Sequence, residues 1–461
     1  MKIRLDKMNE ATQPDKGVQQ DLYVSYPARG LSGKIRVPGD KSISHRALLV
    51  AALSGEPCEI LGLSSGQDVI NTARAIEILG ARIERHGDCV VVSGGPENLS
   101  EPDQAIDLGN SGTGMRLIAG LVARFPFLTV LTGDESLSSR PMDAVAEPLE
   151  KMGAKISGRS GGRFAPLVVQ GGELEGISFT PKTPSAQVKS AVLLAALGAK
   201  SKTVITETVA TRTHTEDILA LAGLDIKTTQ TGAGRVIELS PGPVGSFNVN
   251  IPADPSQAAF WVVAASIVPD SEIEIENVYC GKDRIGYIDI LTQMGANIRL
   301  TRPSRPIEGV RDSSHDNQGE IYNIEVSYSG GLSGIDISGD DITGLDEVPI
   351  LALAGALAEG TTTFYKVGPL RSKETDRIAT ITSEFTKLGI DVRELAADSF
   401  SVAGGKISGG LVDSCGDHRI AMTCSIAGLV ASGPVFVTGF GAVNTSYPSF
   451  RDHLRKLVYW K

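Results

Sequence analysis

A helix ending, a glycine and a short strand-like run recur together about every 70 residues along this 461-residue chain. The amphipathic segment ends near Leu or Met, and the copies lie at residues 79–83, 152–156, 221–226, 294–298 and 388–392. A glycine directly after a helix can adopt the left-handed conformation that turns the chain into a strand. We predict that turn at each copy, and a helix-like stretch at residues 453–457 closes a sixth unit.

A second pattern runs beside the first: an apolar helix rich in Ala and Leu, a turn, and a β-branched strand. Examples lie at residues 47–60, 192–205, 258–275, 350–364 and 420–437. Six units of helix, strand, helix and strand divide into two groups of three, which predicts an α/β protein with two similar lobes. Pro38-Gly39 and residues 251–255 are the predicted breaks, and the polar segment 302–318 is a predicted insertion. An α/β protein with coincidental spacing is the alternative.

Composition and net charge limit the classes of binding partner that we expect for this chain. The chain is 41% hydrophobic and 21% charged, which is typical of globular proteins. A net charge of −10 argues against a nucleic acid or an anionic membrane as partner, because both require a basic face. Any anionic ligand must therefore meet a local cluster of basic side chains.

Cysteines and apolar runs indicate the compartment. The five cysteines include no C-x-x-C pair, so neither a disulfide framework nor a zinc site is expected. Reduced thiols are typical of the cytoplasm, which is the predicted location. No run reaches the roughly 18 uncharged apolar residues of a membrane span, and residues 1–20 are predicted to form a flexible N-terminal tail.

Two segments in the N-terminal half suit anion binding at a helix start. In residues 37–46, Ser42 and Ser44 can cap a helix, and Lys41 and Arg46 add positive charge, although the spacing is not that of a Walker A loop. A glycine-rich turn at 108–116 leaves backbone amides open to a ligand. A plain capped helix with solvated basic residues is the alternative for the first segment.

Further segments offer hydroxyl, guanidinium or carboxylate groups at element ends: residues 138–142, 183–187, 211–216, 344–349, 373–377 and 416–422. A carboxylate between cations suits acid/base chemistry, and Arg can pair with a carboxylate or phosphate through two hydrogen bonds. Ordinary caps and exposed loops are the alternatives, and His418 could equally be a packing residue.

Taken in order, these segments resemble the enolpyruvyl transferases, and within them the 5-enolpyruvylshikimate-3-phosphate synthase family. The resemblance covers about Leu31 to Phe450 and rests on G-D-K-S-I-S-H-R, G-N-S-G-T, S-R-P-M, S-A-Q, K-E-T-D-R and G-D-H-R-I-A-M. The sister enzyme that acts on UDP-N-acetylglucosamine would show K-N where Lys41 precedes Ser42, and a loop cysteine near residues 133–140. That enzyme, and a non-catalytic anion-binding module, are the alternatives.

The resemblance implies a two-lobed, inside-out α/β barrel of six βαβαββ-like units, three per lobe. One lobe would comprise residues 39–252, and the other residues 21–38 and 253–461 with both termini. The implied reaction moves the enolpyruvyl group of phosphoenolpyruvate to the 5-hydroxyl of shikimate 3-phosphate and releases phosphate. No metal or organic cofactor is implied, and the family's usual state is a monomer.

The resemblance also implies roles for individual residues. The implied catalytic residues are Lys41, Asp346 and Glu374, with Asp346 as the base at the hydroxyl and the other two sharing the acid role at C3. Shikimate 3-phosphate would be held by Lys41, Ser42, Arg46, Ser185, Ala186 through its backbone, Gln187, Arg212, Asp346 and Lys373. Phosphoenolpyruvate would be held by Lys41, Gly112, Arg140, Gln187, Arg377 and Arg419.

Two positions bear on how far the resemblance extends. Some family members carry Lys three residues before the proline of the last motif, where this chain has Thr445-Ser446-Tyr447-Pro448. One anion contact is therefore expected to be absent. Gly112 stands where glyphosate-insensitive relatives carry Ala, so we expect this chain to be a glyphosate target.

Overall fold

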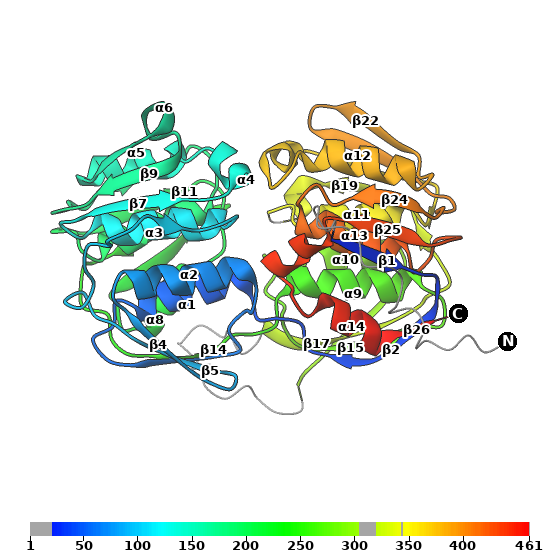
Figure 1. The fold of residues 1–461 in the computed structure, drawn as a ribbon, viewed down its shortest axis with the longest axis horizontal. Coiled ribbons are helices and arrows are strands. Elements are labelled where there is room, and N and C mark those ends of the chain that lie inside the picture. The colour runs from blue at the N-terminus through cyan, green and yellow to red at the C-terminus, as the bar shows by residue number, and fades with distance from the viewer. Residues whose placement is uncertain (1–20, 304–319, 343, 461) are drawn as a thin grey trace, which may run out of the picture.

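The structure is a computed structural model that describes residues 21–303, 320–342 and 344–460. The predicted tail and nearly all of the predicted insertion lie outside the described residues. Figure 1 shows two bodies side by side, each with helices and strands throughout. We call the body that contains elements α1 to β14 the middle lobe, and the body that contains both ends of the described chain the terminal lobe.

The described part of the middle lobe contains three four-stranded sheets with one common plan. In each sheet an edge strand pairs in parallel with the second strand, and the remaining pairs are antiparallel. The first sheet contains, in spatial order, β14 (Asn248–Asn250), β3 (Cys58–Leu61), β5 (Cys89–Ser93) and β4 (Arg82–His86). The second sheet contains β6 (Ile106–Asp107), β7 (Leu128–Thr132), β9 (Phe164–Gln170) and β8 (Lys155–Gly158). The third sheet contains β10 (Ser178–Phe179), β11 (Thr203–Glu207), β13 (Gly234–Leu239) and β12 (Ile226–Thr231).

The described part of the terminal lobe repeats this plan with additions. One sheet, β19 (Asp336–Ser338), β21 (Thr361–Tyr365), β23 (Ser399–Ala403) and β22 (Val392–Ala396), follows the plan directly. A five-stranded sheet adds β26 (Val458–Trp460) to β16 (Asn297–Thr301), β17 (Ile321–Ser327), β15 (Glu272–Tyr279) and β2 (Ala28–Ile35). The remaining strands are β1 (Leu22–Ser25), β25 (Val435–Thr438) and β24 (Gly410–Asp413) in one sheet, and β18 (Leu332–Ser333) and β20 (Ala358–Glu359) in another.

Six apolar helices fill the described interiors of the lobes. They are α1 (Lys41–Ala51), α3 (Gly112–Ala123) and α7 (Ala186–Ala196) in the middle lobe, and α9 (Pro255–Ile267), α11 (Val348–Gly355) and α13 (His418–Ala427) in the terminal lobe. Every residue of α9, α11 and α13 is buried. A helix that is apolar on all sides must lie in the interior, which explains why the predicted Ala/Leu helices become central.

Six outer helices and five shorter ones complete the described elements. The former are α2 (Gln67–Ile78), α5 (Asp143–Met152), α8 (His214–Leu221), α10 (Gly286–Gln293), α12 (Arg377–Lys387) and α14 (Phe450–Leu457), and the short ones are α4 (Glu135–Ser139), α6 (Arg159–Gly162), η3 (Gly339–Asp341), η4 (Gly368–Ser372) and η5 (Phe440–Thr445). The glycine after each of the five predicted helix endings has φ between 77° and 118°. The predicted left-handed turn into a strand is therefore confirmed at residues 80, 153, 223, 295 and 389.

The hydrophobic core has two separate parts. One cluster contains buried residues from Ile43 to Ile251, and the other contains residues from Ala28 to Val37 and from Ala253 to Val458. The chain passes between them at 38–40 and 252–254, where Gly39 and Ala253 form an antiparallel bridge. None of the described helices is long and apolar enough to span a membrane.

Asp217, in the first turn of α8, gives one testable consequence of burial. Burial, with the nearby carboxylates of Glu216, Glu320 and Asp283, raises the pKa of Asp217 to about 7, although the Thr213 hydroxyl donates to it at 2.8 Å. Because this pKa lies above the value in an unfolded chain, charging Asp217 opposes folding. The cost is absent below about pH 4 and complete above about pH 7.

We therefore expect Asp217→Asn to raise the free energy of unfolding by about 1–3 kcal/mol at pH 8 and by less at pH 5. Urea unfolding of both proteins at the two pH values measures the difference. An equal gain at pH 5 and pH 8 would contradict the assignment, because it could not come from the charge.

Candidate active site

A cavity of about 590 Å³ lies between the lobes and is lined by residues of both. Most of the sequence-predicted site residues line it: Lys41, Ser42, Gly112, Arg140, Ser185, Gln187, Arg212, Asp346, Lys373, Glu374 and Arg419. They come from the starts of central helices and from the loops next to them. Segments up to about 380 residues apart in sequence thus meet at one cavity.

Three predicted residues lie behind this lining. Ala186 is the first residue of α7, and its carbonyl accepts a hydrogen bond from Arg46 Nη2 at 3.4 Å. Arg46 also donates to the Ser42 carbonyl at 2.8 Å and the Thr215 hydroxyl at 2.7 Å. Arg377 has no exposed surface and supports the cavity through its ion pairs.

Lys41 begins α1 and points at a carboxylate that the sequence analysis did not single out. Its Nζ lies 2.8 Å from Asp68 Oδ2, at the start of α2. Burial alone would lower the pKa of Lys41, but the Asp68 and Glu374 carboxylates outweigh it and raise this pKa. Burial dominates for Asp68, whose pKa is raised despite Lys41. Lys41 therefore carries a charged ammonium group at neutral pH.

Asp346 lies among three cations. The distances from its carboxylate are 3.4 Å to Lys373 Nζ, 3.3 Å to Arg377 Nη1 and 3.6 Å to Arg419 Nη2. Burial would raise the pKa of Asp346, but these cations hold it well below its usual range. Asp346 is consequently ionised at neutral pH and can accept a proton.

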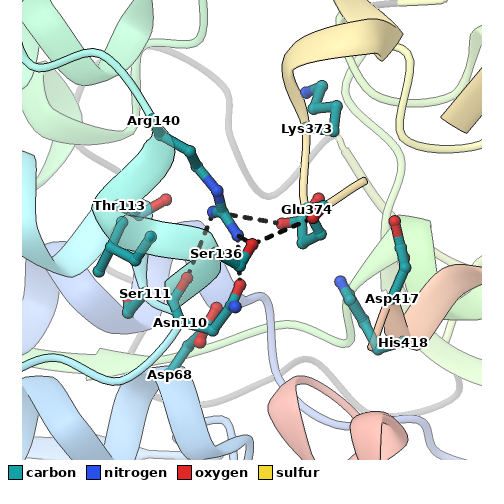
Figure 2. Close-up of polar contacts among 12 residues, drawn as sticks. Asp68, Asn110, Ser111, Thr113, Ser136, Arg140, Lys373, Glu374, Asp417 and His418 are labelled. Atoms are coloured by element: carbon teal, nitrogen blue, oxygen red, sulfur yellow. Dashed lines mark hydrogen bonds and ion pairs between the residues drawn. The ribbon is translucent and has the colours of Figure 1, made fainter. Parts of the chain in front are cut away.

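Glu374 links the lobes across the cavity. Figure 2 shows Arg140 and Ser136 of the middle lobe directed at Glu374 of the terminal lobe. Arg140 Nη1 lies 3.8 Å from Glu374 Oε1, and the Ser136 hydroxyl donates to the Glu374 carbonyl at 3.0 Å. Burial would raise the pKa of Glu374, but Arg377 and Arg140 hold it well below its usual value.

Arg377 joins the carboxylates of the terminal lobe. Its Nε lies 2.7 Å from Asp417 Oδ2, its Nη2 2.7 Å from Glu374 Oε2, and its Nη1 3.3 Å from Asp346. Asp417 caps α13 by accepting from the Arg419 backbone at 2.8 Å. One guanidinium thus fixes the relative positions of Asp346 and Glu374, which both line the cavity.

The wall of the middle lobe is built around the glycine-rich turn. Arg116 Nη1 donates to the Gln187 side chain at 3.0 Å and to the Gly112 carbonyl at 3.2 Å. Gln187 donates in turn to Thr113 at 2.9 Å. Burial lowers the pKa of Arg116 to about 10, so it still carries its charge at neutral pH. Arg116 was not among the predicted site residues. It is, however, the last residue of the glycine-rich segment 108–116, which was predicted to approach a ligand.

Arg212 reaches the terminal lobe from the loop before α8. Its Nη1 donates to the Ser42 hydroxyl at 3.4 Å, and a Cβ added at Gly344 would lie 2.9 Å from its Nη2. A side chain at residue 344 would push the Arg212 guanidinium away from the loop that carries Asp346. Gly344 has φ +84°, which also favours glycine.

His418 and the last motif meet behind the cavity. His418 lines the cavity but is almost completely buried, and its Nδ1 hydrogen bonds with the Ser446 hydroxyl. Burial, with Arg419 and Lys41, holds the pKa of His418 well below its usual value, so the ring is neutral. Ser446 belongs to the last motif, where this chain differs from some family members, and its hydroxyl positions the His418 ring. Among the described residues no group of three or more His, Cys, Asp or Glu is arranged to hold a metal ion.

Comparisons with known proteins agree with this geometry. The family model of EPSP synthase (3-phosphoshikimate 1-carboxyvinyltransferase) matches residues 26–454. Two proteins named 3-phosphoshikimate 1-carboxyvinyltransferase, from Carboxydothermus hydrogenoformans and Bacillus cereus, are 44% and 41% identical to this chain, covering 93% of it and 97% of each relative. The structure of EPSP synthase from Acinetobacter baumannii superposes with a TM-score of 0.80 at 37% identity, over 95% of this chain and 98% of that one.

These matches confirm the family and the type of enzyme predicted from the sequence, and they do not favour the alternative transfer to a UDP-sugar. The mixed α/β fold is confirmed by the likeness to solved EPSP synthases. The roles of single site residues stay predictions. The chain belongs to the EPSP synthase (3-phosphoshikimate 1-carboxyvinyltransferase) family.

Proposed function

We propose that this site transfers the enolpyruvyl group of phosphoenolpyruvate to the 5-hydroxyl of shikimate 3-phosphate. The hydroxyl oxygen adds to C2 of phosphoenolpyruvate while C3 gains a proton. The intermediate then loses a proton from C3 and phosphate from C2, which regenerates the double bond. The observation that carries the proposal is the convergence of Lys41, Asp346 and Glu374 on one cavity that both lobes line with cations.

Charge supports the placement of the substrates. Two phosphates and two carboxylates must be bound together, and arginine and lysine supply the required counter-charge. We place shikimate 3-phosphate against Ser42, Ser185, Gln187, Arg212 and Lys373, with Arg46 and the Ala186 backbone behind them. We place phosphoenolpyruvate against Lys41, Gly112, Gln187, Arg140 and Arg419, with Arg377 behind them.

The protonation states support a division of roles. Ionised Asp346 can take the proton of the attacked hydroxyl, and charged Lys41 can deliver one to C3. Glu374 is ionised while Arg377 and Arg140 face it. Bound substrate anions would neutralise those cations and raise the pKa of Glu374, so that it could share the acid role with Lys41.

The test is phosphate release from phosphoenolpyruvate, with shikimate 3-phosphate and UDP-N-acetylglucosamine offered in parallel. We expect release with shikimate 3-phosphate alone. Release with the UDP-sugar alone would overturn the choice of acceptor. A folded protein that binds phosphoenolpyruvate but releases no phosphate with either acceptor would instead be a binding module.

We also infer that the architecture is an inside-out barrel of six βαβαββ-like units, three per lobe. The common sheet plan and the six central helices support this inference. The two core clusters support lobe boundaries at residues 39–252, and at 21–38 with 253–461. A monomeric state, a cytoplasmic location and independence of nucleic acid and membrane stay predictions.

Gly112→Ala tests the phosphoenolpyruvate side of the cavity. The added methyl carbon would lie 2.9 Å from Arg116 Nη1 and 3.3 Å from Arg140 Nη1, so both guanidinium groups must move. We expect KM for phosphoenolpyruvate to rise several-fold with kcat nearly unchanged, because a displaced guanidinium weakens ground-state and transition-state binding alike. Glyphosate, which inhibits the unaltered protein in our prediction, should inhibit this variant less.

Steady-state kinetics with each substrate varied in turn measure the effect. A rise in KM for shikimate 3-phosphate alone would place phosphoenolpyruvate elsewhere in the cavity. Absence of inhibition of the unaltered protein by millimolar glyphosate, at low phosphoenolpyruvate, would contradict the expected sensitivity.

A further inference from the structure

The two crossings between the lobes form one hydrogen-bonded unit. The backbone N–H of Asp40 donates to the Pro252 carbonyl at 2.8 Å, and that of Asp254 donates to the Pro38 carbonyl at 2.9 Å. Each crossing ends in the aspartate that caps a central helix: Asp40 caps α1 of the middle lobe, and Asp254 caps α9 of the terminal lobe. The starts of these two helices are therefore neighbours.

A single buried guanidinium joins both caps. Arg284, in the loop before α10, places Nη1 2.5 Å from Asp40 Oδ2 and Nη2 3.1 Å from Asp254 Oδ1. The second Asp254 oxygen accepts from the Lys41 backbone N–H at 3.1 Å. The side chains of Arg284 and Asp40 are at most 2% exposed, so this pairing lies out of contact with solvent.

The same guanidinium also reaches the segment that carries the proposed base. Arg284 Nη2 donates to the Ser256 hydroxyl at 3.2 Å, and this hydroxyl in turn hydrogen bonds with the Glu347 carboxylate. Glu347 is buried and directly follows Asp346. A continuous polar chain thus runs from the start of α1, where Lys41 lies, to the start of α11, where Asp346 lies.

Stability alone does not account for this arrangement. Burying an ion pair costs desolvation that its attraction often fails to repay, and apolar side chains of the same volume frequently stabilise a core better. Here one cation lies among three buried carboxylates, those of Asp40, Asp254 and Glu347. What the guanidinium fork supplies is geometry, because it holds several partners at fixed angles.

We propose that Arg284 is a positioning residue that sets the distance between Lys41 and Asp346 across the two lobes. The inference rests on the proposed enolpyruvyl transfer, in which these two groups act on the same reacting pair. Arg284 itself does not line the cavity among the described residues. Its influence therefore falls on the transition state, where alignment counts, more than on the charge-driven binding of the substrates.

The test compares Arg284→Lys, which keeps the charge but has no planar fork, with Glu347→Gln, which keeps the shape but weakens the Ser256 link. We expect kcat to fall at least about tenfold in Arg284→Lys, with each KM within about threefold of the unaltered protein. Glu347→Gln should show a smaller loss of the same kind. Phe400→Leu is the matched control, since it loosens the buried stack with Phe364 in the terminal lobe and removes no member of the polar network.

Thermal melting of all variants separates an effect on the positioning of the catalytic groups from an effect on the stability of the fold. Phe400→Leu should lower the melting temperature and leave kcat unchanged. An Arg284→Lys protein that is folded and has unchanged kcat would overturn the inference, as would a loss of kcat in Phe400→Leu that matches its loss of stability. Absence of turnover in the unaltered protein would instead contradict the proposed function and is recognised separately. If Arg284→Lys does not fold, Glu347→Gln decides alone.

Discussion

Replacing Asp346 with asparagine is expected to lower kcat by about 10³-fold, the size of a typical general-base contribution. The carboxylate is ionised because Lys373, Arg419 and Arg377 surround it, so it can accept the proton of the attacked hydroxyl. Asparagine keeps the shape but cannot accept that proton. Removal of one negative charge from a cationic site should leave the binding of both anionic substrates intact or tighter.

Phosphate release under saturating substrates measures kcat, and titration of shikimate 3-phosphate measures binding. Asp143→Asn is the matched control, because Asp143 is an exposed carboxylate at the rim of the same cavity, in the first turn of α5. It should retain nearly full kcat. If Asp346→Asn keeps more than about a tenth of the turnover, Asp346 is not the base.

Local features explain what could be predicted of the fold. A glycine after a helix acts within a few residues, so the turn at Gly153 follows from the chain itself. The predicted cap of α1 is wrong, because Asp40 caps this helix and Ser42 and Ser44 lie inside it. The start of α3 was also missed, because this helix begins at Gly112, within the segment predicted as a turn. The pairing of β26 with β2 joins residues at opposite ends of the described chain, and no local pattern indicates it. Long-range pairing of this kind depends on the packing of the whole lobe.

The site shows the same division between local and distant information. Lys41 and Glu374 lie in motifs, whereas Asp68 stands in an amphipathic helix without any motif and becomes part of the site through its contact with Lys41. The sequence did contain a signal for Arg116, because this residue ends the glycine-rich segment 108–116 that was predicted to approach a ligand. The hydrogen bond from Ser136 to Glu374 depends on how the lobes meet, which the sequence does not reveal.

Arg377 shows how a predicted binding residue can also be a structural one. The sequence predicts a contact with phosphoenolpyruvate, whereas the guanidinium is completely buried and paired with Asp417, Glu374 and Asp346. Burial alone would lower the pKa of Arg377, but these carboxylates outweigh burial and raise the pKa above its usual value. Any contact with substrate must therefore use the edge of Arg377 between Asp346 and Glu374.

We expect Arg377→Met to destabilise the terminal lobe by about 3–5 kcal/mol, because removal of one partner leaves a buried charge uncompensated. Asp417, which has no exposed surface, is the carboxylate most affected. Urea unfolding, followed by a signal from the terminal lobe such as Trp261, measures the loss. A change below about 1 kcal/mol would show that the buried carboxylates find other partners.

The double variant Arg377→Met with Asp417→Asn separates stability from function. Asparagine caps a helix as well as aspartate, so α13 keeps its start, and the uncompensated charge at residue 417 is gone. We expect this protein to recover much of the lost stability. Turnover should stay low, because Glu374 and Asp346 no longer share the guanidinium that fixes their relative positions. Recovery of both stability and turnover would show that Arg377 serves the fold alone and has no part in the reaction.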